Sequence, residues 1–224
     1  MSESDIKIPF GDGELSAIWN APGNAKAGLV LAHGAGAGMR HRFFTSATAG
    51  LAVRDIATLR YQFPYMEAGR KSPGSPRPAI ESVRAAVKEA ARLAPDLPLF
   101  AGGKSYGARM TSTAESEEHL AGVRGLVFFG FPLHPPGKQS TERGAHLGSV
   151  TVPMLFLQGS RDAFAEDQLI KRVCADLGSL AALKHFESAD HSFHVPKSVG
   201  SDAEVMIGLV DAVSDWIEDL TVGQ

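Results

Sequence analysis

The chain has little cysteine, no long apolar run and no excess of basic charge. Its 224 residues contain one cysteine, Cys174, which excludes a disulfide within the chain and favours a reducing compartment. No apolar stretch approaches the ~18 residues that a bilayer span requires. The formal net charge is −3, so the chain lacks the basic field that attracts nucleic acids or anionic membranes.

Targeting and metal-binding patterns are also missing. Residues 1–5 are polar and acidic, whereas a secretory signal starts basic and then becomes apolar. The sequence has no His-Glu-x-x-His pattern, paired cysteines or acidic calcium loop. We therefore expect a cytoplasmic protein without metal or cofactor that binds neither nucleic acid nor membrane. We interpret Cys174 as a core residue of a helix, and the oligomeric state stays open.

Short apolar runs alternate with helical patterns along the chain. With 44% hydrophobic and 21% charged residues, residues 1–224 suit one α/β domain. Strands are expected at residues 6–10, 15–19, 29–32, 56–59, 97–101, 123–129, 154–157 and 183–186. Apolar residues recur every three or four positions over 80–93 and 205–220, as in amphipathic helices. This alternation predicts a doubly wound, mostly parallel sheet of about seven to eight strands, with helices on both faces.

Two segments interrupt the alternation. Residues 62–78 and 131–151 are rich in proline and glycine, and both follow strand candidates. Loops at the carboxyl ends of strands build the sites of open α/β sheets. We expect both segments to be loops that border the pocket, although ordinary surface connections are the alternative.

The residues Gly103-Lys104-Ser105-Tyr106-Gly107 form a G-x-S-x-G motif between the strand candidate 97–101 and a helical pattern from residue 108. This strand–turn–helix context is typical of a nucleophile elbow, which holds a serine hydroxyl at the tip of a strained turn. Only glycine at positions 103 and 107 lets the turn pack against its neighbours. The motif therefore predicts Ser105 as a nucleophile.

A serine nucleophile needs a base, and a histidine base needs a carboxylate to orient it. His191 follows the last strand candidate, so its loop returns to the edge of the sheet that carries Ser105. Asp162 follows the preceding strand candidate and is the expected acid. Asp190 is the weaker alternative because adjacent side chains diverge, and Asp167 lies within a helical pattern. The other histidines considered, taken as structural, are His134, His185 and His194.

The glycine-rich segment 33–38 follows the strand candidate 29–32. Its small residues let backbone amides approach a ligand closely. We expect the amide of Ala35, or that of Gly36, to form an oxyanion hole with the amide of Tyr106. Gly34 and Gly36 would border the substrate. A phosphate-binding loop is disfavoured, because the glycine spacing does not match and Pro98 stands where such a loop before Lys104 needs glycine.

Two basic residues complete the expected site. Lys104 precedes the nucleophile and could either pair with a nearby acid or place positive charge near the substrate. Arg60 ends the strand candidate 56–59 and is expected to face the pocket. Both are candidate substrate-binding residues.

Taken together, these motifs resemble the α/β-hydrolase superfamily, and within it the small, cap-less, dienelactone-hydrolase-like proteins. The resemblance covers essentially the whole chain and implies the α/β-hydrolase fold without a cap domain. It also implies a Ser105–Asp162–His191 triad acting through an acyl-enzyme. Dienelactone hydrolases use cysteine where Ser105 stands here. That departure favours a serine esterase, carboxylesterase-like, acting on small-molecule esters or thioesters.

Other functions stay open at this stage. A non-catalytic interaction module that kept the fold is the main rival, since fold and function separate readily. Peptide cleavage or perhydrolysis would use the same residues. The natural substrate is not identified.

Overall fold

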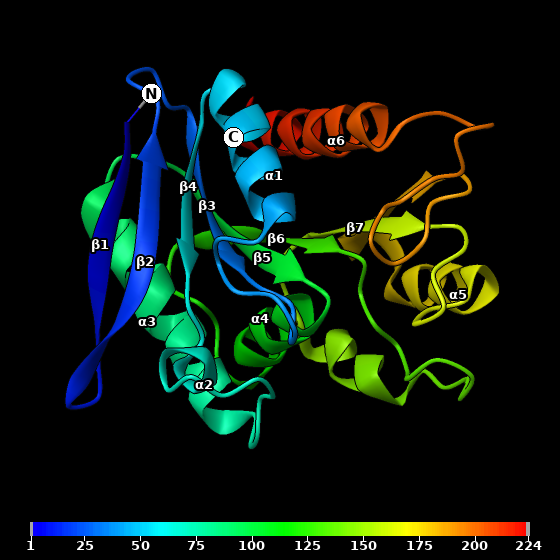
Figure 1. Ribbon diagram of the computed structural model, residues 1–224, viewed down its shortest axis with the longest axis horizontal. Coiled ribbons are helices and arrows are strands. Elements are labelled where there is room, and N and C mark those ends of the chain that lie inside the picture. Colours follow the sequence, from blue (N-terminus) through cyan, green and yellow to red (C-terminus); the bar gives the residue numbers. More distant parts are fainter. Residues whose placement is uncertain (1, 223–224) are drawn as a thin grey trace.

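The computed structural model describes residues 2–222, in which eight strands form one sheet (Figure 1). Across the sheet the order is β1-β2-β4-β3-β5-β6-β7-β8. The strands are β1 (Ser2–Phe10), β2 (Gly13–Ala21), β3 (Ala27–Ala32), β4 (Ile56–Tyr61), β5 (Leu99–Lys104), β6 (Val123–Phe129), β7 (Met154–Gly159) and β8 (Ala181–Phe186). Strands β1 and β2 form an antiparallel hairpin, β2 runs antiparallel to β4, and the other pairs are parallel. The prediction of a mostly parallel sheet is confirmed.

Helices cover both faces of the sheet (Figure 1). Helices α1 (Arg42–Val53) and α6 (Asp202–Val222) pack on one face, and α3 (Arg77–Leu93), α4 (Tyr106–Glu117) and α5 (Asp167–Leu177) pack on the other. In β3, Leu29 and Leu31 belong to the hydrophobic core under α1 and α6. Val30 and Ala32 belong to the core under α3, α4 and α5. Burial on both faces explains why the strand is apolar throughout. Within residues 2–222, no helix is long and apolar enough to cross a membrane.

The two segments expected to be loops contain helical turns. Residues 62–78 include the short helix α2 (Pro64–Glu67) and the start of α3, and residues 131–151 include a 3₁₀ segment, Glu142–Ser149. Pro64 and Pro78 occupy the first turns of their helices. The N–H groups of the first turn have no acceptor within the helix, so the N–H that proline lacks is not missed there. Proline can therefore start a helix as well as interrupt one. Neither segment holds a further domain, and the described chain has no cap.

The central strands bring the expected site together. Strands β3, β5, β6, β7 and β8 are parallel, so their carboxyl ends lie at one edge of the sheet. The segments after β3, β5, β7 and β8 carry the glycine-rich segment, Ser105, Asp162 and His191 respectively. Four segments distant in the sequence therefore meet at that edge.

Candidate active site

Ser105 lies at a sharp turn between β5 and α4. Its backbone has φ +53° and ψ −115°, a conformation that non-glycine residues rarely adopt. The turn packs against the end of β3, where a Cβ atom at Gly103 or Gly107 would lie 2.3 or 2.1 Å from the carbonyl oxygen of Ala32. The Ser105 amide donates to the Phe129 carbonyl over 3.1 Å. Close packing on neighbouring strands thus holds the strained turn in place.

The side chains of Ser105, His191 and Asp162 form one hydrogen-bonded chain. The Oγ atom of Ser105 lies 2.8 Å from Nε2 of His191, and Nδ1 of His191 lies 2.7 Å from Oδ2 of Asp162. The Phe164 ring packs against the imidazole with centroids 4.3 Å apart. With Asp162 accepting at Nδ1, the ring leaves Nε2 free to accept the serine proton.

Asp162 is buried, and each of its oxygens accepts a further hydrogen bond. Oδ2 accepts from Nε2 of Gln158 over 2.6 Å, and Oδ1 accepts from the Phe164 amide over 2.8 Å. The Oε1 atom of Gln158 accepts from the Phe131 amide over 3.0 Å, which sets the orientation of the amide group. Sequence reasoning assigned no role to Gln158 or Phe164. The sequence signal that could have indicated Gln158 is a glutamine directly after the apolar run 154–157.

The alternative acid has other partners. The Oδ1 atom of Asp190 accepts from the amides of Ser192 and His194 over 2.7 and 3.0 Å, so this carboxylate stabilises the turn that carries His191. The remaining histidines that were considered pair elsewhere: His194 with Asp202, His134 with Glu166 and His185 with Asp167. Among these groups, only Asp162 contacts the His191 ring.

Two buried rings orient the glycine-rich segment. The Nδ1 atom of His33 donates to the Gly34 carbonyl over 2.8 Å, while its Nε2 accepts from the Phe63 amide over 3.0 Å. Burial lowers the pKa of His33 to about 4, so the ring is neutral at neutral pH, as this pair of hydrogen bonds requires. In a trans peptide the C=O and the following N–H point in opposite directions. Anchoring the Gly34 carbonyl therefore sets the direction of the Ala35 amide.

The second ring is that of Tyr65, whose hydroxyl donates to the Ala35 carbonyl over 2.8 Å and so orients the Gly36 amide in the same way. The amide of Tyr106 is the first in α4, where helical amides lack intrahelical partners. Gly34 lies against Ser105, since a Cβ atom there would be 3.8 Å from the Ser105 Cβ. Tyr65 was missed because it lies in a segment that was expected to be a loop.

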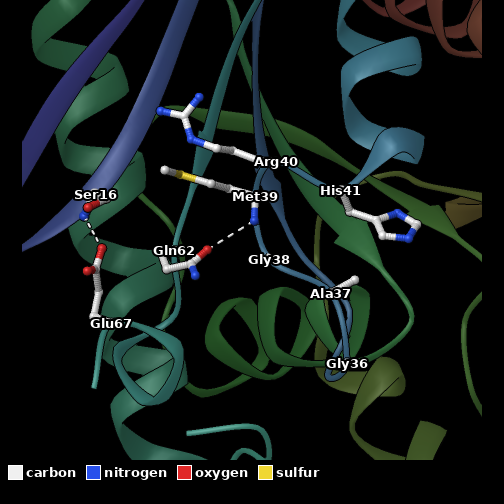
Figure 2. Close-up of a pocket in the computed structure, with 9 residues that line it drawn as sticks. All are labelled: Ser16, Gly36, Ala37, Gly38, Met39, Arg40, His41, Gln62 and Glu67. Atoms are coloured by element: carbon white, nitrogen blue, oxygen red, sulfur yellow. Dashed lines mark hydrogen bonds between the residues drawn. The ribbon is translucent and has the colours of Figure 1, made fainter. Parts of the chain in front are cut away.

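A cavity of about 450 Å³ opens beside this segment (Figure 2). Gly36 and its neighbours as far as His41 line it, together with Gln62 and with Glu67 from α2. The Gln62 side chain accepts from the Met39 amide over 3.0 Å, and Figure 2 shows this hydrogen bond between two residues that line the cavity. The segment 62–78 therefore borders this cavity. A second cavity of about 530 Å³ lies between the starts of α1 and α6, and Lys104 lines it.

The two expected basic residues differ in position. Lys104 donates from Nζ to the backbone carbonyl of His191 over 2.6 Å, so it contacts the histidine segment directly. Arg60 is buried against α1, where it donates to the Thr48 hydroxyl over 3.1 Å and pairs with Glu3 at 2.5 Å. Burial lowers the pKa of Arg60 from its usual value. The expectation that Arg60 faces the substrate does not fit these contacts, because its guanidinium is buried and its two terminal nitrogens bind Thr48 and Glu3.

Comparisons with known proteins agree with this fold. Residues 25–218 match the family described as alpha/beta hydrolase domain. An alpha-beta serine hydrolase homologue from Coxiella burnetii superimposes with a TM-score of 0.77 at 18% identity, covering 96% of this chain and 97% of the other. An α/β serine hydrolase without lid from Xanthomonas campestris gives 0.74 at 18% identity, with 96% and 94% covered. A dienelactone hydrolase from Anabaena variabilis gives 0.77 at 15% identity, with 97% of each chain covered.

The family match spans most of the chain, and the solved structures share the arrangement of the whole sheet. Since these structures are at most 18% identical to the chain, they show its fold and not its substrate. The expected cap-less fold, with its likeness to dienelactone hydrolases, is confirmed. The chain belongs to the α/β-hydrolase domain family, whose fold supports a hydrolase activity.

Proposed function

We propose that the protein is a serine hydrolase that cleaves small carboxylic esters or thioesters. The observation that carries the proposal is the unbroken hydrogen-bonded chain from Asp162 through His191 to Ser105, with distances of 2.7 and 2.8 Å. A serine in a strained turn, with an imidazole at its hydroxyl and a buried carboxylate behind that imidazole, is the arrangement that activates a serine.

In the proposed reaction, His191 takes the Ser105 proton at Nε2 as Oγ attacks the carbonyl carbon. The amides of Ala35 and Tyr106 hold the resulting oxyanion, and each such donor is worth ~3 kcal/mol in the transition state. The C–O or C–S bond then breaks, and His191 gives its proton to the departing alcohol or thiol. A water molecule, deprotonated by His191, attacks the acyl-enzyme, and the acid and free Ser105 result.

The substrate should be small. The two cavities beside the segment 33–41 hold about 450 and 530 Å³, and the described chain has no cap above them. Binding sites for small molecules fall in this size range. Short acyl and alcohol groups fit such a site, whereas a long lipid chain would extend into solvent.

Labelling with a fluorophosphonate, followed by peptide mass spectrometry, tests the proposal. Such probes react with a serine that a base and an oxyanion hole have activated. We expect an adduct on Ser105 in the wild type, its loss in Ser105→Ala and His191→Ala, and its retention in Ser46→Ala, which changes an exposed serine lining the second cavity. Hydrolysis of short esters should fall by several orders of magnitude in Ser105→Ala. Folded wild-type protein without an adduct, or Ser105→Ala with unchanged turnover, would contradict the proposal.

A further inference from the structure

Lys104 precedes the nucleophile and places a cation beside the base. Its Nζ atom lies 2.6 Å from the His191 carbonyl oxygen, and 5.0 and 4.9 Å from the ring centres of Phe43 and Phe193. Within residues 2–222 no carboxylate lies within ion-pair distance of this ammonium. Surface lysines extend into water, so an enclosed ammonium bound to a carbonyl and two aromatic rings calls for an explanation.

We infer that Lys104 is a positioning residue that anchors the backbone of His191 and places a positive charge beside the base. The inference rests on the proposed function of Ser105. Residue 105 binds the His191 ring through Oγ, and residue 104 binds the His191 carbonyl through Nζ. One rigid turn between β5 and α4 thus holds the histidine at two points. A misplacement of about 1 Å in such a contact can cost ~100-fold in rate.

The charge acts on the base as well. Burial lowers the pKa of Lys104 to about 8, against the attraction of Asp162 and Asp190. The other charged or titratable groups around its cavity are His41 and Arg42 at the start of α1 and Asp202 at the start of α6. Below pH 8 the ammonium is charged, and a cation near an imidazole disfavours the imidazolium. We therefore expect the loss of this charge in Lys104→Met to favour protonation of the nearby ring.

The test compares Lys104→Met, Lys104→Arg and Lys26→Met with wild type. Methionine fills a similar volume without charge or donor, arginine keeps both, and Lys26 is an exposed lysine whose loss changes the net charge equally. With a short ester, we expect Lys104→Met to lose ~10-fold or more in kcat while KM changes little. The acid limb of its profile of kcat/KM against pH should move up by about one pH unit. Lys26→Met should match wild type.

Lys104→Arg, which keeps a charge and a donor, should retain more of the wild-type kcat than Lys104→Met does. Thermal midpoints and near-ultraviolet circular dichroism show whether each variant is folded. A folded Lys104→Met with wild-type kcat and pH profile overturns the inference.

An NMR titration of the His191 ring, assigned by comparison with His191→Gln, tests the role of Lys104 separately from the proposed hydrolase function, because the titration requires no turnover. A wild type without serine-dependent hydrolysis would defeat the proposed function alone. A His191 titration midpoint that Lys104→Met leaves unchanged would overturn the inferred effect of the Lys104 charge, whatever the activity.

Discussion

At the scale of single residues, two carboxylates near His191 are distinguished by what their oxygens accept. Asp162 accepts from the imidazole and from Gln158 through one oxygen, and from the Phe164 amide through the other. Asp190 accepts only from amides of its own turn, those of Ser192 and His194. The first carboxylate can hold the tautomer of the ring, and the second can hold only the turn.

The substitution of Asp162 by asparagine should therefore cost far more than the same change at Asp190. An asparagine side chain at 162 can turn a donor toward Nδ1, which places the imidazole proton on the wrong nitrogen. In a serine protease with a Ser-His-Asp triad the same change lowers kcat by ~10⁴, and we expect a loss of similar order here. Asp190→Asn should lower kcat by less than ~10-fold, since its contacts are to backbone amides. Steady-state kinetics with a short ester measures both, and a larger loss in Asp190→Asn would reverse the assignment of the acid.

At the scale of elements, the turn between β5 and α4 is held by contact with β3. Gly107, in the first turn of α4, packs against the end of β3. The Cβ atom of any other residue at this position would lie 2.1 Å from the Ala32 carbonyl oxygen. Because the obstacle is backbone in a central strand, it cannot move aside as a flexible side chain would. The geometry of the turn at Ser105 thus depends on a contact between Ala32 and Gly107, about 75 residues apart in the sequence.

Gly107→Ala should accordingly destabilise the protein by ~2 kcal/mol or more, as overpacking against a fixed backbone does. Gly74→Ala is the matched control, since Gly74 is exposed and a Cβ atom there meets nothing within 4 Å. Urea denaturation gives the free energy of unfolding of both variants. Equal stability of the two would show that α4 can shift away from β3 without cost.

At the scale of the whole molecule, the site is formed by the carboxyl edge of the sheet and the segments that follow its strands. His41 lines both cavities, of which one is bordered by α2 and the other by the starts of α1 and α6. Figure 1 shows α1 and α6 on the face opposite α3 and α4, so the second cavity belongs to a different layer of the fold. Connecting segments thus line both cavities, while the parallel strands set the positions of Ser105, Asp162 and His191.

Across a series of p-nitrophenyl esters, kcat/KM should be highest for acetate to butyrate and should fall by ~10-fold or more by decanoate. The reason is that the described chain has no cap to cover a long acyl chain, and each buried CH₂ contributes ~0.8 kcal/mol only while it leaves water. Thioesters of the same acids serve as the parallel series. A rise in kcat/KM through decanoate would contradict a site without a deep acyl channel.

The sequence by itself determined the strands of the sheet and their order along the chain. Apolar runs such as 29–32 and 123–129 become strands β3 and β6, because a strand buried on both faces must be apolar throughout. Ser105, Asp162 and His191 could be chosen because parallel strands bring their following segments to one edge. Local patterns of this kind depend on residues near in the sequence.

Only the tertiary structure decided which distant groups meet. Three contacts join residues that are far apart in the sequence. Lys104 binds the His191 carbonyl, 87 positions away, and Tyr65 binds the Ala35 carbonyl, 30 positions away. Arg60 pairs with Glu3, 57 positions away. Arg60 lies within β4, one residue before its end, and its side chain contacts Thr48 of α1 and pairs with Glu3. The partner of a buried polar group depends on how helices and strands pack, and no local pattern in the sequence carries that information.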